Sequence, residues 1–218
     1  MPHPTTAGAP RRLHLRRARC DLRFKIFNYG AGNLFSIQSA LKKEGVTPSL
    51  TKTGAGMEEA DALILPGVGS FDQAAKALPM ARLRDQIVSG KPVLGICLGL
   101  QLFFGTSEEG SRKGFALLRG TVRRFPASVK VPQIGWNTLD VSRSSRLAEG
   151  VPTNSWVYYV NSYYPETKGR WVAATSTYGL EYAALIEEGN IYGTQFHPEK
   201  SGLAGRTILK NFVRAVKK

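Results

Sequence analysis

A cysteine stands on a glycine-flanked turn in the segment Gly95-Ile96-Cys97-Leu98-Gly99. The apolar run that ends at Ile96 predicts a strand, and the segment that begins at Leu98 predicts a helix, so Cys97 occupies a strand-to-helix turn. This is the layout of a nucleophile elbow with cysteine in place of serine. The helix N-terminus favours a thiolate and offers backbone N–H groups to an oxyanion. A buried structural cysteine between packing glycines is the alternative.

One histidine is placed to serve such a thiol. Two of the three histidines lie within the first 14 residues, which leaves His197 for the rest of the chain. His197 follows the apolar run 191–196, and strand ends on one edge of a parallel sheet meet at the same rim, so it could converge with Cys97. Glu199 is spaced to orient the imidazole. A histidine that only caps a strand is the alternative, but the combination favours a Cys97, His197 and Glu199 triad.

Two glycine-rich turns are candidate ligand loops. Pro66-Gly67-Val68-Gly69 follows an apolar run, and its backbone amides are candidates for an oxyanion hole, the alternative being a plain turn. Glycines on both sides of Val68 also leave the peptide between Gly67 and Val68 free to rotate. In the other turn, Phe35 stands where a dinucleotide fingerprint requires its third glycine, so binding of NAD is not expected.

Strands and helices must position these residues, and they alternate from Phe24 onward. Apolar runs of four or five residues predict strands, and apolar positions at helical spacing predict the helices between them. The expected strands are 24–27, 46–50, 62–65 and 93–96, and the expected helices carry the stripes 34–41, 80–88 and 98–104.

After Arg119 strand-like runs follow one another, and a final helix carries the stripe 208–216. The turn at Gly189 and Asn190 suits a hairpin. This order predicts one α/β domain over residues 24–218, with a mixed, mostly parallel central sheet and helices on both faces. The expected strands of this half are 121–125, 134–139, 156–163, 171–177, 182–186 and 191–196.

Composition narrows the class of protein. The chain has 218 residues, of which 42% are hydrophobic, so it can bury one core. Two cysteines and three histidines argue against a disulfide framework and a structural zinc site. The longest uncharged runs fall short of the ~20 residues that span a bilayer. We therefore expect a soluble protein of a reducing compartment, the cytoplasm, that binds no membrane.

The net charge of +14 raises the question of nucleic acid binding. Residues 1–25 hold seven basic residues against Asp21 alone, which accounts for +6 and leaves +8 for the other 193. No aromatic-studded basic groove accompanies this charge, so no nucleic acid partner is expected. Residues 1–23 lack an apolar periodicity, which indicates a basic, disordered extension, such as a tail, a wrong start site or a targeting segment.

The motifs resemble those of a known family. The cysteine turn with Gln101, together with Gln195-Phe196-His197-Pro198-Glu199, resembles the nucleophile and histidine motifs of class I, triad-type glutamine amidotransferases, whose fold is flavodoxin-like. Further segments are similar to the glutaminase subunit of imidazole glycerol phosphate synthase. They are residues 28–33 (NYGAGN), 65–71 (LPGVGSF), 131–137 (VPQIGWN) and 197–202 (HPEKSG). The resemblance covers about residues 24–216.

The resemblance implies an activity and a set of site residues. The family hydrolyses L-glutamine and passes ammonia to a (β/α)₈ cyclase subunit in a heterodimer, which makes imidazole glycerol phosphate and an aminoimidazole carboxamide ribotide in histidine biosynthesis. No metal or organic cofactor is required. The resemblance also implies a triad of Cys97, His197 and Glu199. Substrate or oxyanion contacts would come from Gly67, Val68, Gly69, Leu98, Gln101, Glu109, Ser162 and Tyr163, and partner contacts from Trp136, Asn137 and Lys200.

Two departures and two alternatives accompany this interpretation. Asn28 stands where the family usually has aspartate, and Asn161 where it usually has histidine. Neither belongs to the triad. One alternative is the glutaminase of another class I amidotransferase, against which Val68 and Trp136 argue. The other is a non-catalytic regulatory module of the same fold, against which the intact triad argues.

Overall fold

A computed structural model describes residues 22–30, 33–67 and 69–218. The basic segment expected over residues 1–23 lies almost wholly outside this range, and so does Val68. The strands are β1 (Phe24–Phe27), β2 (Ser49–Thr51), β3 (Ala62–Leu65), β4 (Val93–Ile96), β5 (Thr121–Arg124), β6 (Gln133–Val141), β7 (Ser155–Asn161), β8 (Tyr163–Glu166), β9 (Val172–Thr177), β10 (Glu181–Glu188) and β11 (Ile191–Thr194). The helices are α1 (Leu34–Lys43), α2 (Gly54–Glu58), α3 (Phe71–Ala77), α4 (Met80–Val88), α5 (Leu98–Gln101) and α6 (Gly202–Lys217), with a 3₁₀ turn, η1, at Pro198–Lys200.

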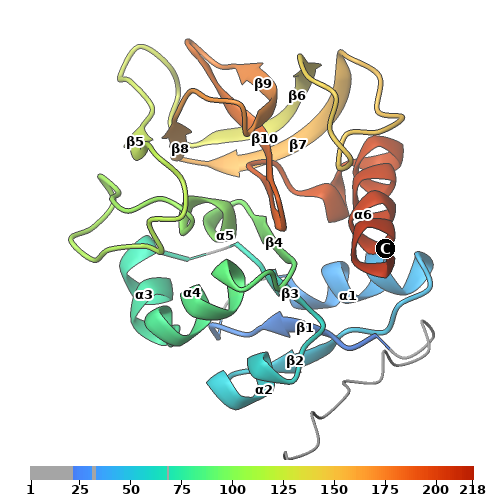
Figure 1. The fold of residues 1–218 in the computed structure, drawn as a ribbon. Helices are drawn as coiled ribbons and strands as arrows, with labels where there is room; N and C mark the ends of the chain where they lie inside the picture. The colour runs from blue at the N-terminus through green and yellow to red at the C-terminus, as the bar shows by residue number, and fades with distance from the viewer. Residues whose placement is uncertain (1–21, 31–32, 68) are drawn as a thin grey trace, which may run out of the picture.

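One large sheet organises the described residues, with the strand order β2-β1-β3-β4-β11-β10-β9-β6-β7 (Figure 1). Every pair from β2 to β11 is parallel, and every pair from β11 to β7 is antiparallel. The expected single α/β unit with a mixed sheet is confirmed. Strand β11 lies beside β4 although 94 residues of chain separate Ile96 from Ile191, so the segments that carry Cys97 and His197 end at the same rim.

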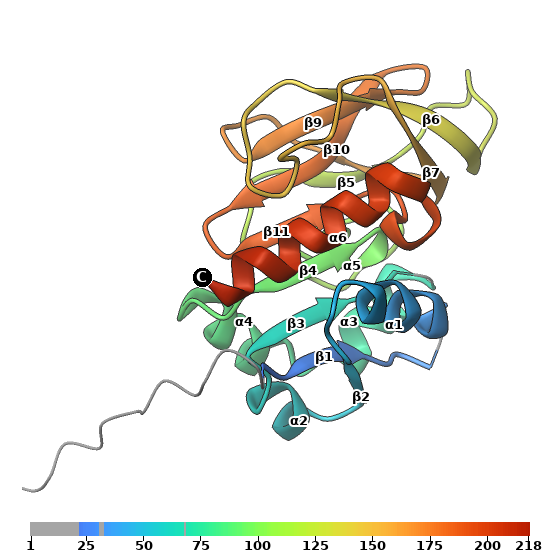
Figure 2. The same ribbon diagram turned by 90° about the vertical axis from the view of Figure 1, so that its right-hand side faces the viewer.

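The parallel half is buried on both faces. Strands β3, β4 and β11 have no exposed residue, as their continuous apolar runs require. Helices α1 and α6 cover one face, where Ile37 and Phe212 join the core, and α2 to α5 cover the other (Figure 2). The helices thus cover the two faces of the sheet, and the loops that follow the parallel strands lie at the rim where Cys97 and His197 are found.

The antiparallel half continues the same sheet from β11 to β7. The two-residue turn of Gly189 and Asn190 joins β10 to β11, as the sequence predicts. Strands β5 and β8 form a separate two-stranded sheet beside it. Tyr159 on β7 packs edge to face against Tyr182 on β10 and against Phe196. No helix among the described residues is long and apolar enough to span a bilayer.

Three expected elements differ from the structure. Strand β2 begins only at Ser49, because Pro48 has no N–H for the ladder. Helix α5 ends at Gln101 instead of 104, because the carbonyls of residues 102 and 103 accept bonds from residues 115 and 117. The run 156–163 is two strands, β7 and β8, divided at Ser162. Helices α2 and α3 are not among the expected elements, although their capping residues Thr53 and Ser70 are available signals.

Candidate active site

Cys97 occupies a strained turn between β4 and α5. Its backbone φ is 53° and its ψ is −105°, a region that cysteine rarely adopts. The flanking glycines are required by contact: a Cβ on Gly95 would lie 2.5 Å from the Gly99 carbonyl oxygen, and one on Gly99 would collide with the Leu65 carbonyl oxygen. The predicted elbow is therefore present, and backbone packing against β3 fixes it.

His197 and Glu199 form a buried pair at the end of β11. The imidazole Nδ1 lies 2.9 Å from Glu199 Oε1, and the two side chains are 3% and 1% exposed. The His197 backbone N–H donates to the Tyr158 carbonyl at 2.9 Å, which ties this segment to β7. Glu199 is thus able to orient the ring and to stabilise its protonated form.

The environment of His197 favours the imidazolium. Burial lowers its pKa, but interactions with Cys97 and Glu199 outweigh burial and raise the pKa to about 10. Its Nε2 is buried and has no hydrogen-bond partner of standard geometry among the described residues. The pairing of β11 with β4 sets Thr194 opposite Ile96, so the structure brings the cysteine and the histidine that follow these strands to the same rim. The two are 100 positions apart in the chain.

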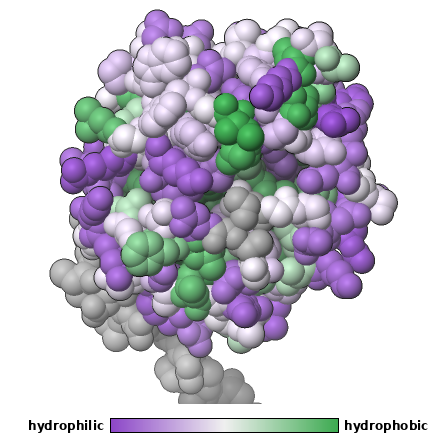
Figure 3. Space-filling view, turned by 180° about the vertical axis from the view of Figure 1, so that it is seen from behind, coloured by the Kyte–Doolittle hydropathy of each residue, from purple (hydrophilic) through white to green (hydrophobic). Residues whose placement is uncertain are grey.

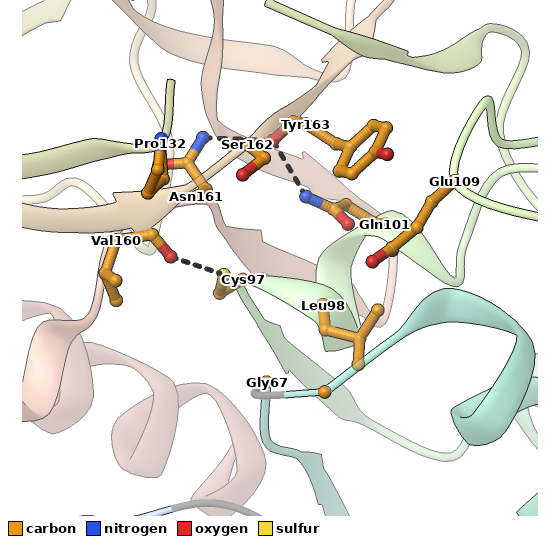
Figure 4. Close-up of a pocket in the computed structure, with 11 residues that line it drawn as sticks. Gly67, Cys97, Leu98, Gln101, Glu109, Pro132, Val160, Asn161, Ser162 and Tyr163 are labelled. Atoms are coloured by element: carbon orange, nitrogen blue, oxygen red, sulfur yellow. Dashed lines mark hydrogen bonds between the residues drawn. The ribbon is translucent and has the colours of Figure 1, made fainter. Parts of the chain in front are cut away.

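A pocket of about 330 Å³ opens beside the Cys97 sulfur (Figure 4). It lies between the elbow, the loop after β3 and the β7–β8 junction. It gathers every substrate or oxyanion residue expected from the sequence that the structure describes, while Val68 lies outside the described residues. The lining consists of Gly67, Gly69, Cys97, Leu98, Gln101, Glu109, Pro132, Val160, Asn161, Ser162 and Tyr163.

Glu109 supplies a carboxylate to this pocket. Its Oε2 accepts a hydrogen bond from the Phe71 N–H at 3.0 Å, at the start of α3. Burial raises the pKa of Glu109, the Phe71 N–H opposes that rise, and nearby Asp72 adds to it. The Glu109 carboxylate points toward the pocket in Figure 4 and is suited to a cationic group such as an ammonium.

Gln101 is held by the wall of the pocket. Its Nε2 donates to the Tyr163 carbonyl oxygen at 3.0 Å and to Gln195 Oε1 at 3.1 Å. Its own amide oxygen is left for a ligand. Gln195, a member of the histidine motif to which the sequence assigns no role, is completely buried, and its Nε2 donates to Cys97 Sγ at 3.4 Å.

The loop after β3 lies against the elbow. A Cβ on Gly67 would collide with the Ile96 carbonyl oxygen and the Leu98 backbone nitrogen. Leu98 begins α5, and no backbone carbonyl of the described residues accepts its N–H. That N–H and the Gly67–Gly69 loop therefore flank the space where a tetrahedral oxyanion next to Cys97 would form.

The three residues expected to contact a partner lie outside the pocket. Trp136 on β6 is 53% exposed, and its ring meets Tyr158 edge-on at 5.8 Å. Lys200 Nζ lies 5.5 Å from the centre of the same Tyr158 ring. Asn137 differs, because its side chain donates to the Thr177 carbonyl at 2.9 Å and so makes a hydrogen bond within this chain.

The two departures from the family pattern have separate roles. Asn28 Oδ1 accepts a hydrogen bond from the Gly30 N–H at 2.8 Å and shapes the turn after β1. Asn161 lines the pocket, and its Nδ2 donates to the Tyr163 carbonyl at 3.0 Å. Within the described part of the chain, no three His, Cys, Asp or Glu side chains cluster as metal ligands would.

Known proteins resemble this chain over most of its length. Residues 25–216 match the family model "Glutamine amidotransferase class-I". Proteins named imidazole glycerol phosphate synthase subunit HisH are similar: the one from Methanosarcina mazei is 47% identical over 197 residues, covering 88% of this chain and 98% of that protein. The one from Moorella thermoacetica is 44% identical over 88% of this chain and 94% of its own.

Solved structures share the fold. A crystal structure titled glutamine amidotransferase has a TM-score of 0.70 at 19% identity, over 89% of this chain and 98% of that one. A glutamine amidotransferase from Thermotoga maritima has a TM-score of 0.65 at 15% identity, over 90% and 98% of the two chains. At these identities the likeness concerns the fold alone.

Proposed function

This chain belongs to the class I glutamine amidotransferases and, within them, to the HisH subunits of imidazole glycerol phosphate synthase, and we propose that it hydrolyses L-glutamine through Cys97, His197 and Glu199. The observation that carries this proposal is the Cys97 sulfur on its strained elbow, which opens into the pocket beside a buried imidazole–carboxylate pair. A thiol nucleophile with an oriented acid–base partner is what amide hydrolysis requires.

The first half of the reaction forms a thioester. The Cys97 thiolate attacks the carboxamide carbon of glutamine, and the carbonyl electron pair moves to oxygen. The Leu98 N–H and the amides of the Gly67–Gly69 loop stabilise that oxyanion. As the C–N bond breaks, protonated His197 donates its proton to the nitrogen, and ammonia leaves. The raised pKa of His197 keeps this proton available at neutral pH.

The second half returns the enzyme to its starting state. In the thioester the sulfur carries no charge, so one of the two interactions that raise the His197 pKa is gone. The neutral imidazole then takes a proton from water, which attacks the γ-glutamyl carbonyl carbon. The C–S bond breaks, and its electron pair returns to sulfur as thiolate. Glutamate leaves, and His197 keeps the proton.

The pocket walls provide for the amino-acid end of the substrate. The carboxylate of Glu109 is suited to the α-ammonium group, and the Gln101 amide oxygen accepts a second N–H from the same group. Ser162 and Tyr163 of the β7–β8 junction also line the pocket (Figure 4), and their polar groups would meet the substrate carboxylate. The pocket thus offers separate groups to the reacting carboxamide and to the amino-acid end of glutamine.

The ammonia serves a second subunit. The similar proteins are named as subunits of imidazole glycerol phosphate synthase. The partner would be a (β/α)₈ cyclase that uses ammonia to form imidazole glycerol phosphate and an aminoimidazole carboxamide ribotide. We place its contact on the cluster of Trp136, Tyr158 and Lys200, next to exposed Ile134. The face that is seen from behind carries separate apolar patches among hydrophilic side chains (Figure 3).

The decisive experiment changes Cys97 to Ala in the complex with the cyclase from the same organism. Glutamine-dependent synthesis should disappear, while synthesis from added ammonium salt should continue, because Cys97 acts only in releasing ammonia. Loss of both activities would assign Cys97 to the fold or to docking instead. If glutamine-dependent synthesis survived, Cys97 would not be the nucleophile.

A further inference from the structure

Among the described residues outside the triad, one polar side chain forms a hydrogen bond with the Cys97 sulfur. Gln195 follows β11, is 0% exposed, and places its amide nitrogen 3.4 Å from Sγ. The sulfur's other contact is with the Val160 carbonyl oxygen at 3.9 Å, to which only a thiol can donate. A thiolate has no proton to give, so in that form the sulfur can accept from Gln195 but not donate to Val160.

The orientation of the Gln195 amide follows from its neighbours. The backbone carbonyl oxygen of Tyr163 only accepts, so the Gln101 atom that meets it at 3.0 Å must be the NH₂ group. The same nitrogen lies 3.1 Å from one terminal atom of Gln195, which must therefore be the oxygen. The Gln195 atom at the sulfur is then the NH₂ group. A flipped amide would set two donors against each other.

We propose that Gln195 is a further catalytic residue, whose Nε2–H donates to the Cys97 thiolate and is held in place by a relay from the Tyr163 carbonyl through Gln101. The inference rests on the proposed function for its catalytic consequence, although the contact itself does not. The donor acts twice: it stabilises the thiolate before attack, and it meets the sulfur again when the C–S bond of the thioester breaks and the electron pair returns.

The relay also explains two buried glutamines at the site. An unpaired buried amide is costly, and here each amide has a partner: Gln101 bonds to Tyr163 and Gln195, and Gln195 bonds to the sulfur. Gln101 lines the substrate pocket, whereas Gln195 does not. Gln195 therefore acts on the nucleophile and leaves substrate binding to Gln101.

The test measures alkylation of Cys97 by iodoacetamide against pH in the full chain, read by mass spectrometry of the peptide that contains Cys97. Gln195→Leu removes the donor and keeps the bulk. Gln195→Glu keeps the shape and sets an acceptor against the sulfur. Thr194→Val is the matched control, because Thr194 is equally buried on the adjacent position and its hydroxyl has no partner among the described residues.

We expect Gln195→Leu to slow alkylation at pH 7 by about ten- to a hundredfold, the value of one charge-assisted hydrogen bond, and to move its midpoint upward by about one to two pH units. Gln195→Glu should slow it further. The other titratable side chains around the sulfur are His197, Glu199, Tyr182 and, across the pocket, Glu109. They are unchanged in every variant, so the shift is assigned to Gln195.

Unchanged alkylation in a folded Gln195→Leu chain, with the Thr194→Val control also unchanged, overturns the proposal. Folding is checked by thermal unfolding. If the Gln195→Leu variant does not fold, the alkylation rate of the isosteric Gln195→Glu variant tests the proposal instead. In the wild-type chain, the ¹⁵N side-chain amide signal of Gln195 must change with pH at the same midpoint as the alkylation of Cys97. An amide signal that stays constant through that midpoint also overturns it. Because alkylation needs no glutamine, its result tests the contact between Gln195 and Cys97 even if the chain proves to have no glutaminase activity.

Discussion

At the residue scale, the contacts of His197 determine whether its imidazole carries the proton that the departing ammonia needs. Burial alone would lower its pKa, and the opposing interactions with Cys97 and Glu199 raise it to about 10. A histidine at its ordinary value would be mostly neutral at pH 7.5 and would have no proton for the departing ammonia. The 2.9 Å contact with Glu199 is therefore part of the acid function as well as of ring orientation.

This predicts the alkaline limb of the pH profile. The folded-state pKa of His197 is raised, so its acid form persists from neutral pH and is lost as pH rises through about 10. The limb of kcat/KM for glutamine should lie near that value. In Glu199→Gln one raising interaction is gone, so the limb should move to lower pH. An unmoved limb in this variant would mean that Glu199 only supports the fold.

The same pair of residues predicts a ranking of rate losses. His197→Asn removes the group that transfers the proton and should lower kcat by about 10²–10⁴-fold. Glu199→Gln keeps an oxygen near the ring and removes only its charge, so its loss should be smaller. Steady-state ammonia release by the two variants, each in complex with the cyclase, measures the ranking. A larger loss in Glu199→Gln would reverse the assigned roles.

At the element scale, the elbow depends on two strands, β3 and β4, and the short helix α5 meeting without side chains between them. Gly95, Gly99 and Gly67 each stand where a Cβ would strike backbone atoms of the neighbouring segment. Backbone cannot yield as a flexible side chain does, so these contacts fix the distance between the β3 loop and the β4–α5 turn. The helix itself, of four residues, is too short to hold the turn alone.

Gly99→Ala should therefore be costly, by about 1–3 kcal/mol of unfolding free energy or more, because its Cβ would collide with the Leu65 carbonyl. Gly54→Ala is the matched control: its Cβ would sit 3.4 Å from a Pro79 side-chain carbon, and alanine favours the helix α2. Urea unfolding of both variants measures the difference. Equal stabilities would show that the β3 loop moves aside without cost.

At the scale of the whole molecule, the pocket and the predicted partner surface share β7. Val160 and Asn161 line the pocket, while Tyr158 on the same strand carries Trp136 and Lys200 against its ring. A partner seated on Tyr158 would therefore press on the strand whose Val160 carbonyl oxygen lies 3.9 Å from the Cys97 sulfur. Binding that favours one arrangement of this rim would raise glutaminase activity by shifting its population.

We accordingly expect glutamine turnover to rise at least about 10²-fold when the cyclase and its ribotide ligand are added, since one oxyanion donor has that effect on rate. Trp136→Ala should weaken binding of the cyclase and reduce this stimulation. Val88→Ala, an exposed apolar residue on α4, is the control and should change neither. Full activity of the isolated chain would contradict this expectation and would mean that its oxyanion site is already formed without a partner.

Removal of residues 1–21 should leave melting temperature and activity unchanged. The family model begins at residue 25, and the matched Methanosarcina mazei protein is covered over 98% of its length by 88% of this chain. The arginines of this segment would repel one another unless they met an acidic partner. Thermal unfolding and ammonia release of the shortened chain test this, and a large drop in either would show that the segment docks.

Much of this protein follows from local sequence. The apolar runs of β3 and β4, the helical stripes of α1, α4 and α6, and the hairpin at Gly189 each depend on neighbours within a few residues, so pattern alone predicts them. The chemistry of Cys97, His197 and Glu199 is likewise carried by residue type and by two short motifs. The predicted end of α5 is wrong, because backbone bonds from residues 115 and 117 stop the helix.

Tertiary structure decided the remainder, because it alone sets which distant atoms meet. Strand β11 lies beside β4, and that pairing brings His197 to Cys97 across 100 positions. The Gln195 amide could be oriented only once Tyr163, Gln101 and Gln195 were seen in one line of hydrogen bonds. A hydrogen bond depends on distance and direction between atoms, and no spacing along the chain contains either.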